Sequence, residues 1–280
     1  LNRRAVLAFA GVTIATPSAW AQDTGGWRTL PTEPYNGKQD DIYFVDALTG
    51  WYGNGAGKLY RTQDGGETWA LCFEQPGTFI RALGFASASV GYLGNVGVGY
   101  YSCETDPHPL YKTTDGGAAW TPITATGIEA VAGICGIDVQ PIRLIHQGEL
   151  RETHMVHAAG RVGGPAAILR SIDGGETWST LDLSAHVGMI LDVRFFDQDN
   201  GLVCAATNSA VETARAAILA TTDGGRSWTR VYEGERPLEN CWKMSFPTRE
   251  IGYATVQSYD QTNPSRIFIK TTDGGQTWRE

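Results

Sequence analysis

The sequence predicts an all-β fold, a β-propeller built from four-stranded blades, and three observations support this prediction. The 280 residues include 35 glycines and nine tryptophans, a composition typical of short strands joined by tight turns. One turn motif occurs five times, at intervals of 51, 58, 50 and 50 residues. Each repeat contains strand-like segments, four in all, and stacked units of about 50 residues are typical of propeller blades.

The turn motif reads Ser or Thr, any residue, Asp-Gly-Gly, any residue, then Ser, Thr or Ala, and finally Trp. The aspartate can accept hydrogen bonds from the backbone of its own turn, glycine tolerates a positive φ, and tryptophan offers a large packing area between sheets. A fixed place in every repeat spreads the aspartates around the molecule, so we expect a structural role for them and no shared metal or catalytic site. The predicted structural residues are Asp64 and Trp69, Asp115 and Trp120, Asp173 and Trp178, Asp223 and Trp228, and Asp273 and Trp278.

The other strands repeat together with the turn motif. In four repeats a first strand with alternating apolar residues reaches a phenylalanine six residues before a glycine, and such alternation is typical of a strand with one buried face. The glycine opens a second strand, a third strand leads into the turn, and the tryptophan belongs to the fourth. The third repeat contains an apparent insertion from Pro141 to Arg151. The four pairs are Phe44 and Gly50, Phe85 and Gly91, Phe195 and Gly201, and Phe246 and Gly252.

The N-terminus has the layout of a secretory signal peptide over residues 1–21. Arg3 and Arg4 precede an apolar run from Ala5 to Ala15, and Ala19-Trp20-Ala21 forms a cleavage signal. We therefore expect an exported protein, periplasmic or extracellular, or in an equivalent lumen, whose propeller occupies residues 22–280. The paired arginines permit twin-arginine export, with the general secretory route as the alternative. No later apolar run in the sequence is long enough to span a membrane as a helix.

Charge and residue spacing exclude several classes of function. The formal net charge is −8 and no Lys/Arg-rich run occurs, so we expect no nucleic-acid partner, because a basic face is needed to neutralise phosphates. His154 and His157 are three residues apart in a predicted strand and would point to opposite faces, so we expect no metal and no cofactor. Five cysteines in an exported chain permit one or two disulfides, although Cys135 and Cys204 have the surroundings of small core residues.

The repeats carry a family resemblance. The segment from Phe44 to Trp51 reads F-x-D-x-x-x-G-W and, together with the five turn motifs, resembles the BNR/Asp-box propellers over about residues 25–280. Within these it is most similar to the photosystem II stability and assembly factor family and its bacterial relatives. The resemblance implies a non-catalytic assembly or stability scaffold that binds a protein or peptide.

The same resemblance implies more blades than the five visible repeats. Members of the assembly-factor family usually have seven blades, so we expect a ring of five to seven and a chain that is cut short at its C-terminus. A complete five-bladed ring, closed by a strand from Gly25 to Leu30, is the alternative.

The alternative function is a glycoside hydrolase, because sialidases and xyloglucan-cleaving enzymes share the turn motif; carbohydrate is then the alternative partner. A sialidase needs an arginine triad, a Tyr-Glu pair and an Asp acid, and the sequence lacks the aromatic-Arg-Ile-Pro motif that carries the first arginine. A xyloglucanase-like enzyme would use two carboxylates across a central cleft. Asp41 and Asp192 lie on first strands and are the candidates, unless they are solvated or paired to Arg81 or Lys243.

The first strands are also where a partner could dock. The first strand of each blade lines the central channel of a propeller. Five charged residues lie on or beside these strands and form a candidate binding face: Arg81, Arg194, Lys243, Asp41 and Asp192. They are either ion pairs between neighbouring blades or a mixed-charge docking face anchored by the three cations. The inserted segment of the third repeat is the other candidate docking element.

Overall fold

The computed structural model describes residues 29–101, 104–146, 148–264 and 266–280. The predicted signal peptide over residues 1–21 lies outside these residues. The chain divides into two units, residues 1–30 and residues 31–280, and the elements described below belong to the second. They are β-strands apart from one short 3-10 helix, η1 (Ile128–Ala130). No helix in the described part of the chain is long and apolar enough to cross a membrane.

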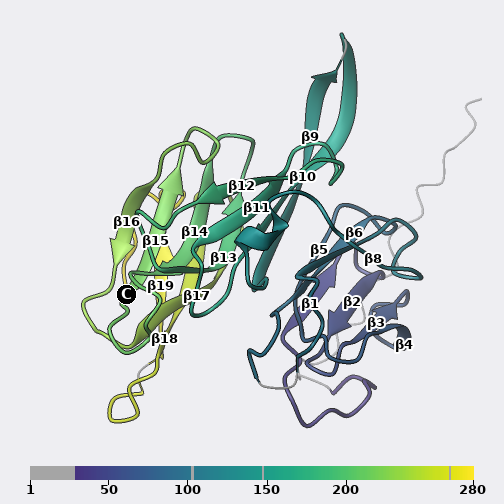
Figure 1. Ribbon diagram of the computed structural model, residues 1–280, viewed down its shortest axis with the longest axis horizontal. Helices are drawn as coiled ribbons and strands as arrows, with labels where there is room; N and C mark the ends of the chain where they lie inside the picture. Colours follow the sequence, from purple (N-terminus) through teal and green to yellow (C-terminus); the bar gives the residue numbers. More distant parts are fainter. Residues whose placement is uncertain (1–28, 102–103, 147, 265) are drawn as a thin grey trace, which may run out of the picture. The chain divides into compact units, whose positions relative to one another are not determined.

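The strands form five antiparallel sheets, each made of strands consecutive in sequence (Figure 1). Four sheets have four strands, and the fifth has three. After the fifth turn motif an isolated bridge joins Lys270 to Arg279, at the place of a fourth strand. The strands, blade by blade, are β1 (Asp41–Phe44), β2 (Gly50–Gly53), β3 (Lys58–Thr62) and β4 (Ala70–Glu74); β5 (Ile80–Phe85), β6 (Gly91–Asn95), β7 (Leu110–Thr113) and β8 (Thr121–Pro122); β9 (Gly136–His146), β10 (Glu149–Ala159), β11 (Ala167–Ser171) and β12 (Ser179–Asp182); β13 (Met189–Phe195), β14 (Gly201–Ala206), β15 (Ala216–Thr221) and β16 (Thr229–Glu233); and β17 (Glu239–Ser245), β18 (Gly252–Ser258) and β19 (Arg266–Thr271).

The hydrophobic core lies between the faces of successive blades. Trp51 and Leu59 of the first blade belong to the same buried cluster as Leu83 and Phe85 of the second. The Trp51 ring stacks on the Phe85 ring with centroids 3.7 Å apart. A blade therefore buries its faces only against its neighbours, which explains why the predicted unit repeats.

Each turn motif is closed by its own side chains. In the first, the Thr62 hydroxyl donates to Asp64 Oδ1 at 2.7 Å and accepts from the Gly66 N–H at 2.8 Å. Asp64 also accepts from the Thr68 N–H at 2.9 Å. Gly65 and Gly66 have φ of 76° and 92°, which other residues rarely adopt. The other four motifs repeat this bonding.

The tryptophans differ in one detail from the prediction. Trp69 lies one residue before β4 instead of within it. The bonding of the turn extends to the N–H of Thr68, so residue 69 leaves the turn before strand pairing begins. The Phe44 and Tyr52 rings pack against this indole, at centroid distances of 6.0 and 4.8 Å.

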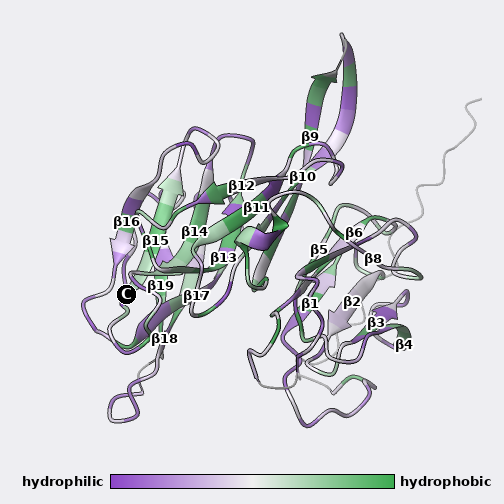
Figure 2. Cartoon of the chain, in the orientation of Figure 1, coloured by the Kyte–Doolittle hydropathy of each residue, from purple (hydrophilic) through white to green (hydrophobic). Residues whose placement is uncertain are grey.

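The insertion in the third repeat is a two-stranded arm. β9 and β10 pair along all eleven residues of each strand, but β11 pairs only with Val156–Ala159. The paired residues 140–146 and 149–155 extend past the rest of the sheet and are called the arm below (Figure 1). Near its tip Ile145 and Leu150 are cross-strand partners, 78% and 65% exposed. Figure 2 shows hydrophobic and hydrophilic stretches alternating along the arm.

Candidate functional site

The charged residues predicted on the first strands lie on β1, β5, β13 and β17, each of which is the strand at one edge of its sheet. Asp41, Asp192 and Lys243 each lie three residues before the phenylalanine of their repeat, on β1, β13 and β17. Arg194 lies two residues further along β13 than Asp192. Arg81 lies in β5 where the register with β6 shifts between Ile80 and Ala82, which makes it a bulge residue.

Each of the three cations pairs with a carboxylate of the preceding blade. Arg81 Nη1 lies 2.6 Å from Asp40 Oδ1. Lys243 Nζ lies 3.4 Å from Asp192 Oδ1 and donates to the Cys135 carbonyl at 2.9 Å. The sequence interpretation offered Arg81 as a partner for Asp41, and the structure pairs it with the adjacent Asp40 instead.

The third ion pair involves a carboxylate that the sequence analysis missed. Arg194 Nη1 lies 2.9 Å from Asp138 Oδ1, and Asp138 lies on β9 with only 4% of its surface exposed. The repeat alignment used phenylalanines, and the third repeat has Val139 where the others have Phe. Asp138 is an acidic residue between the apolar Ile137 and Val139 in the sequence. This pattern could have identified it as a charged residue on a first strand.

The acidic residues also bind the backbone of the next inner strand. Asp41 Oδ2 accepts from the Leu83 N–H at 2.7 Å. Asp138 Oδ2 accepts from the Phe195 N–H at 2.9 Å. Asp192 Oδ2 accepts from the Met244 N–H at 2.9 Å. These carboxylates therefore connect the first blade to the second, the third to the fourth, and the fourth to the fifth.

Burial and charge shift the proton affinities of these groups in opposite directions. Burial raises the pKa of Asp41 and of Asp138, against the effect of the nearby Lys243 and Arg194 charges. Burial alone would lower the pKa of Lys243, but the Asp192 and Asp41 carboxylates reverse this and raise it. Lys243 therefore stays protonated and serves as a fixed positive charge between two blades.

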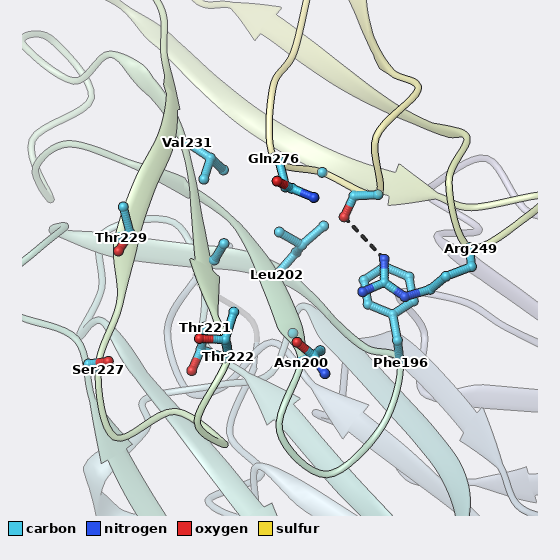
Figure 3. A pocket seen from close by; sticks show the side chains of 14 residues that line it. Phe196, Asn200, Leu202, Thr221, Thr222, Ser227, Thr229, Val231, Arg249 and Gln276 are labelled. Atoms are coloured by element: carbon cyan, nitrogen blue, oxygen red, sulfur yellow. Dashed lines mark hydrogen bonds between the residues drawn. The ribbon is translucent and has the colours of Figure 1, made fainter.

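A pocket lies at a different place, between the fourth and fifth blades (Figure 3). It has a volume of about 490 Å³. Its lining combines apolar side chains with hydroxyl, amide and guanidinium groups, and no carboxylate is among the residues that line it. The lining side chains are Phe196, Asn200, Leu202, Ala220, Thr221, Thr222, Ser227, Thr229, Val231, Arg249 and Gln276.

The sequence analysis did not find this pocket, although the repeats contain a signal for it. The residue before the Ser or Thr that opens the turn motif is Arg61, Lys112, Arg170 or Lys270 in four repeats. In the fourth repeat it is Ala220. The shorter side chain leaves room that the other repeats fill.

A groove of about 540 Å³ follows the base of the arm. Its lining includes two carboxylates, Glu152 and Asp197. Glu152 is paired with Arg143 at 3.0 Å, and Asp197 accepts from the N–H groups of Asp199 and Asn200. Both carboxylates are thus engaged in local contacts. Across the described ranges, no group of three or more His, Cys, Asp or Glu side chains is placed to hold a metal ion.

Comparisons with known proteins show similarity to larger enzymes and to YCF48. No family model matches the chain. A xyloglucanase from a Paenibacillus species is 22% identical over an alignment of 273 residues that covers 90% of this chain and 26% of that protein. The GH74 enzyme of Niastella koreensis has 18% identity and a TM-score of 0.55, over 82% of this chain and 36% of its own. A structure of YCF48 bound to D1 peptide has 16% identity and a TM-score of 0.44, over 90% and 86% of the two chains.

The similarity to the GH74 structure shows the fold. The predicted β-propeller is confirmed, since the sheets are antiparallel blades and the matched GH74 structure superposes on most of the chain. The chain spans about a quarter of the xyloglucanase and about a third of the Niastella koreensis protein. The activities in these names belong to those proteins, and the TM-score to YCF48 is too low to support an argument.

Proposed function

We propose that this chain is a non-catalytic β-propeller that binds a protein or peptide partner and acts as an assembly or stability scaffold. The observation that carries the proposal is the arm. Its two strands pair with no third strand, and near its tip it presents Ile145 and Leu150 to solvent as a cross-strand pair. Exposed apolar side chains on a projecting element are typical of surfaces that a protein partner buries.

The state of the inner-strand carboxylates supports a scaffold over a glycoside hydrolase. Hydrolysis of a glycosidic bond requires two carboxyl groups beside the bond, one of which donates a proton. Asp192 is paired with Lys243, and both Asp41 and Asp192 accept backbone N–H groups from the next blade. The carboxylate oxygens that would have to act on a substrate are therefore already bound to other groups of the protein. An exported chain, as the leader predicts, would meet its partner in the periplasm or outside the cell.

Site-specific cross-linking in the native host tests the arm. A photoreactive amino acid is placed at Ile145, and the matched control carries it at Leu48, which is 57% exposed in the first blade. We expect a discrete cross-linked protein from Ile145 and none from Leu48. No product from Ile145, or the same products from both positions, would contradict the proposal.

The hydrolase alternative has its own test. The purified protein is incubated with xyloglucan and with a sialylated oligosaccharide, and released reducing sugar is measured. We expect no release above the buffer control. Release that disappears in a folded Asp192→Asn variant would instead support the enzyme, since this change removes the charge and keeps the shape of the side chain.

A further inference from the structure

One cross-strand pair of residues occurs at the equivalent position of every blade. The size of its two side chains decides whether the space towards the next blade is filled. In the first blade it joins Trp51 to Arg61, and in the second it joins Tyr92 to Lys112. In the third blade it joins His157 to Arg170. In the fourth blade the equivalent pair is Leu202 and Ala220. The fourth blade is thus the place where a large ring and a cation are both replaced by smaller apolar side chains.

In the first two blades this pair closes the gap to the next turn motif. Trp51 Nε1 donates to the Gly116 carbonyl at 3.1 Å. The Tyr92 hydroxyl and Lys112 Nζ donate to the Gly174 carbonyl at 2.8 and 2.7 Å. Both carbonyls belong to the first glycine of a turn motif, so the ring and the cation fill the space beside it.

Next to the fourth blade, the equivalent glycine carbonyl accepts its hydrogen bond from a residue of the fifth blade. Gly274 is the first glycine of the fifth turn motif, and its carbonyl accepts from Arg249 Nη1 at 3.2 Å. Arg249 lies between β17 and β18 of the fifth blade itself. The volume beside Leu202 and Ala220 stays open as the pocket of Figure 3.

The pocket contains a positive charge held in a fixed plane. The Arg249 guanidinium lies over the Phe196 ring, 3.8 Å from its centroid, and Figure 3 shows the two side chains together at one side of the pocket. Nη1 is bound to Gly274, which leaves Nη2 and Nε as further donors. The neighbouring Asp197 is bound to the N–H groups of Asp199 and Asn200 and does not line the pocket.

The rest of the lining combines hydrogen-bonding groups with an apolar surface. Asn200 Nδ2 and Gln276 Nε2 donate to Asp197 and to the Asp273 carbonyl, so their amide oxygens remain as acceptors. Thr222 and Thr229 contribute hydroxyl groups that donate or accept. Leu202 and Val231 contribute apolar surface. A ligand that matches this lining has several hydroxyls, one flat apolar face and a negative charge.

We propose that this pocket binds a sugar acid, with a hexuronate carboxylate on Arg249 and the ring hydroxyls on the amide oxygens and threonines. The volume of about 490 Å³ lies within the range of ~300–1,000 Å³ common for small-molecule sites. Arginine pairs with carboxylates in fixed geometry, and no carboxylate lines the pocket. Asp197 outside the pocket interacts with the Arg249 charge through space, and its oxygens accept hydrogen bonds from Asp199 and Asn200. The site goes beyond the proposed protein partner and is independent of the arm.

Titration calorimetry with three probes at equal ionic strength tests the proposal: sodium D-glucuronate, D-glucose and sodium acetate. We expect glucuronate to bind roughly tenfold or more tightly than either of the others, because only it offers both a charge and ring hydroxyls. Equal binding of acetate would reduce the pocket to a simple anion site and overturn the sugar assignment. Equal binding of glucose would overturn the role of Arg249, and no binding of glucuronate would overturn the whole proposal.

Variants locate the binding in this pocket. Arg249→Gln should remove the preference for glucuronate, while Arg151→Gln, which changes the net charge equally on the arm, should leave it intact. Ala220→Met fills the pocket with a neutral side chain and should abolish binding; unchanged binding would place the ligand elsewhere. Thermal melting shows whether the variants fold. If Ala220→Met does not fold, Ala220→Lys is the substitute, since lysine occupies this position in two other blades. Loss of cross-linking at Ile145 would leave this result unaffected.

Discussion

At the scale of single residues, the carboxylate of each turn-motif aspartate accepts several hydrogen bonds at once. Asp173 accepts from the Ser171 hydroxyl at 2.8 Å and from the Thr177 N–H at 3.0 Å. Both glycines of this turn have φ of 77°, a conformation that other residues rarely adopt. The carboxylate therefore fixes a backbone that its own residues do not prefer.

Removing one such carboxylate should destabilise the protein. We expect Asp173→Ala to lower the free energy of unfolding by about 1–3 kcal/mol, because the Ser171 hydroxyl and the Thr177 N–H and hydroxyl lose their shared acceptor. Denaturant unfolding of the purified variant measures the change. Thr177→Ala is the matched control, since it removes the Thr177 hydroxyl and keeps the carboxylate. A variant with unchanged stability would show that the turn motif does not depend on its aspartate.

The same carboxylates should make stability depend on acid. Hydrogen bonds from the Thr68 hydroxyl and N–H lower the pKa of Asp64 to about 2, and equivalent bonds from Ser227 lower the pKa of Asp223 to about 2. An unfolded aspartate has a pKa of about 3.9. A folded pKa below the unfolded one gives stability that is present above about pH 4 and is lost as the pH falls towards 2.

The measurement is a series of melting curves between pH 5 and pH 2. Burial raises the pKa of Asp41 and Asp138, and their contribution has the opposite sign, but all five turn aspartates have lowered pKa values and outnumber them. We expect the melting temperature to fall over this interval. A flat profile in this interval would contradict the prediction.

At the scale of elements, the arm has two parts with different roles. Its base contacts the blades: Ile142 and Met155 belong to a buried cluster with Phe195, and the Tyr92 hydroxyl lies 2.8 Å from His154 Nε2. Its outer part, from residue 143 to residue 152, is held by its own strand pairing and the pair between Arg143 and Glu152. The buried contacts of the arm are therefore concentrated at its base, with Leu144 as the residue of the outer part that packs against the core.

Shortening the arm should separate these roles. Residues 143–152 are replaced by Asn-Gly, a two-residue turn that suits an antiparallel hairpin, between the cross-strand partners Ile142 and Thr153. We expect a folded protein with a melting temperature within a few degrees of the wild type, because only the partly buried Leu144 leaves the core. Circular dichroism measures the fold. Collapse of the fold would show that the outer arm stabilises the blades.

At the scale of the whole molecule, the sequence predicts what is local and misses what depends on how blades stack. The turn motifs, the strand order and the place of the insertion follow from residues close in sequence. The pairing of Arg194 with Asp138 joins residues 56 apart, and the pocket exists because Ala220 faces a turn some 50 residues further along the chain. No pattern within one repeat encodes such contacts. Contacts between blades can be predicted only when equivalent positions are compared across repeats.

The stacking of the blades should protect the thiols that lie between them from chemical labelling. Cys204 of the fourth blade and Cys241 of the fifth are fully buried, with their sulfurs 3.0 Å apart. Burial raises the pKa of Cys204 and of Cys135, and it raises the pKa of Cys72 to about 11. Because the thiolate is the reactive form, these thiols should react slowly while the blades stay stacked.

A Cys103→Ser variant, which removes the cysteine outside the described residues, reports on these four thiols alone. We expect Cys72 to be labelled at pH 8 more slowly, on the order of a hundredfold, than in the urea-unfolded protein, since a group with a pKa near 11 is almost wholly protonated there. Cys135, Cys204 and Cys241 should be labelled slowly because they are buried. Mass spectrometry of the labelled peptides assigns each site. Slow labelling of Cys204 and Cys241 that accelerates together with global unfolding would show that the blades open as one cooperative unit. Fast labelling of this pair in the folded protein would show instead that the fifth blade separates from the fourth on its own, and the pocket between them would then open and close with it.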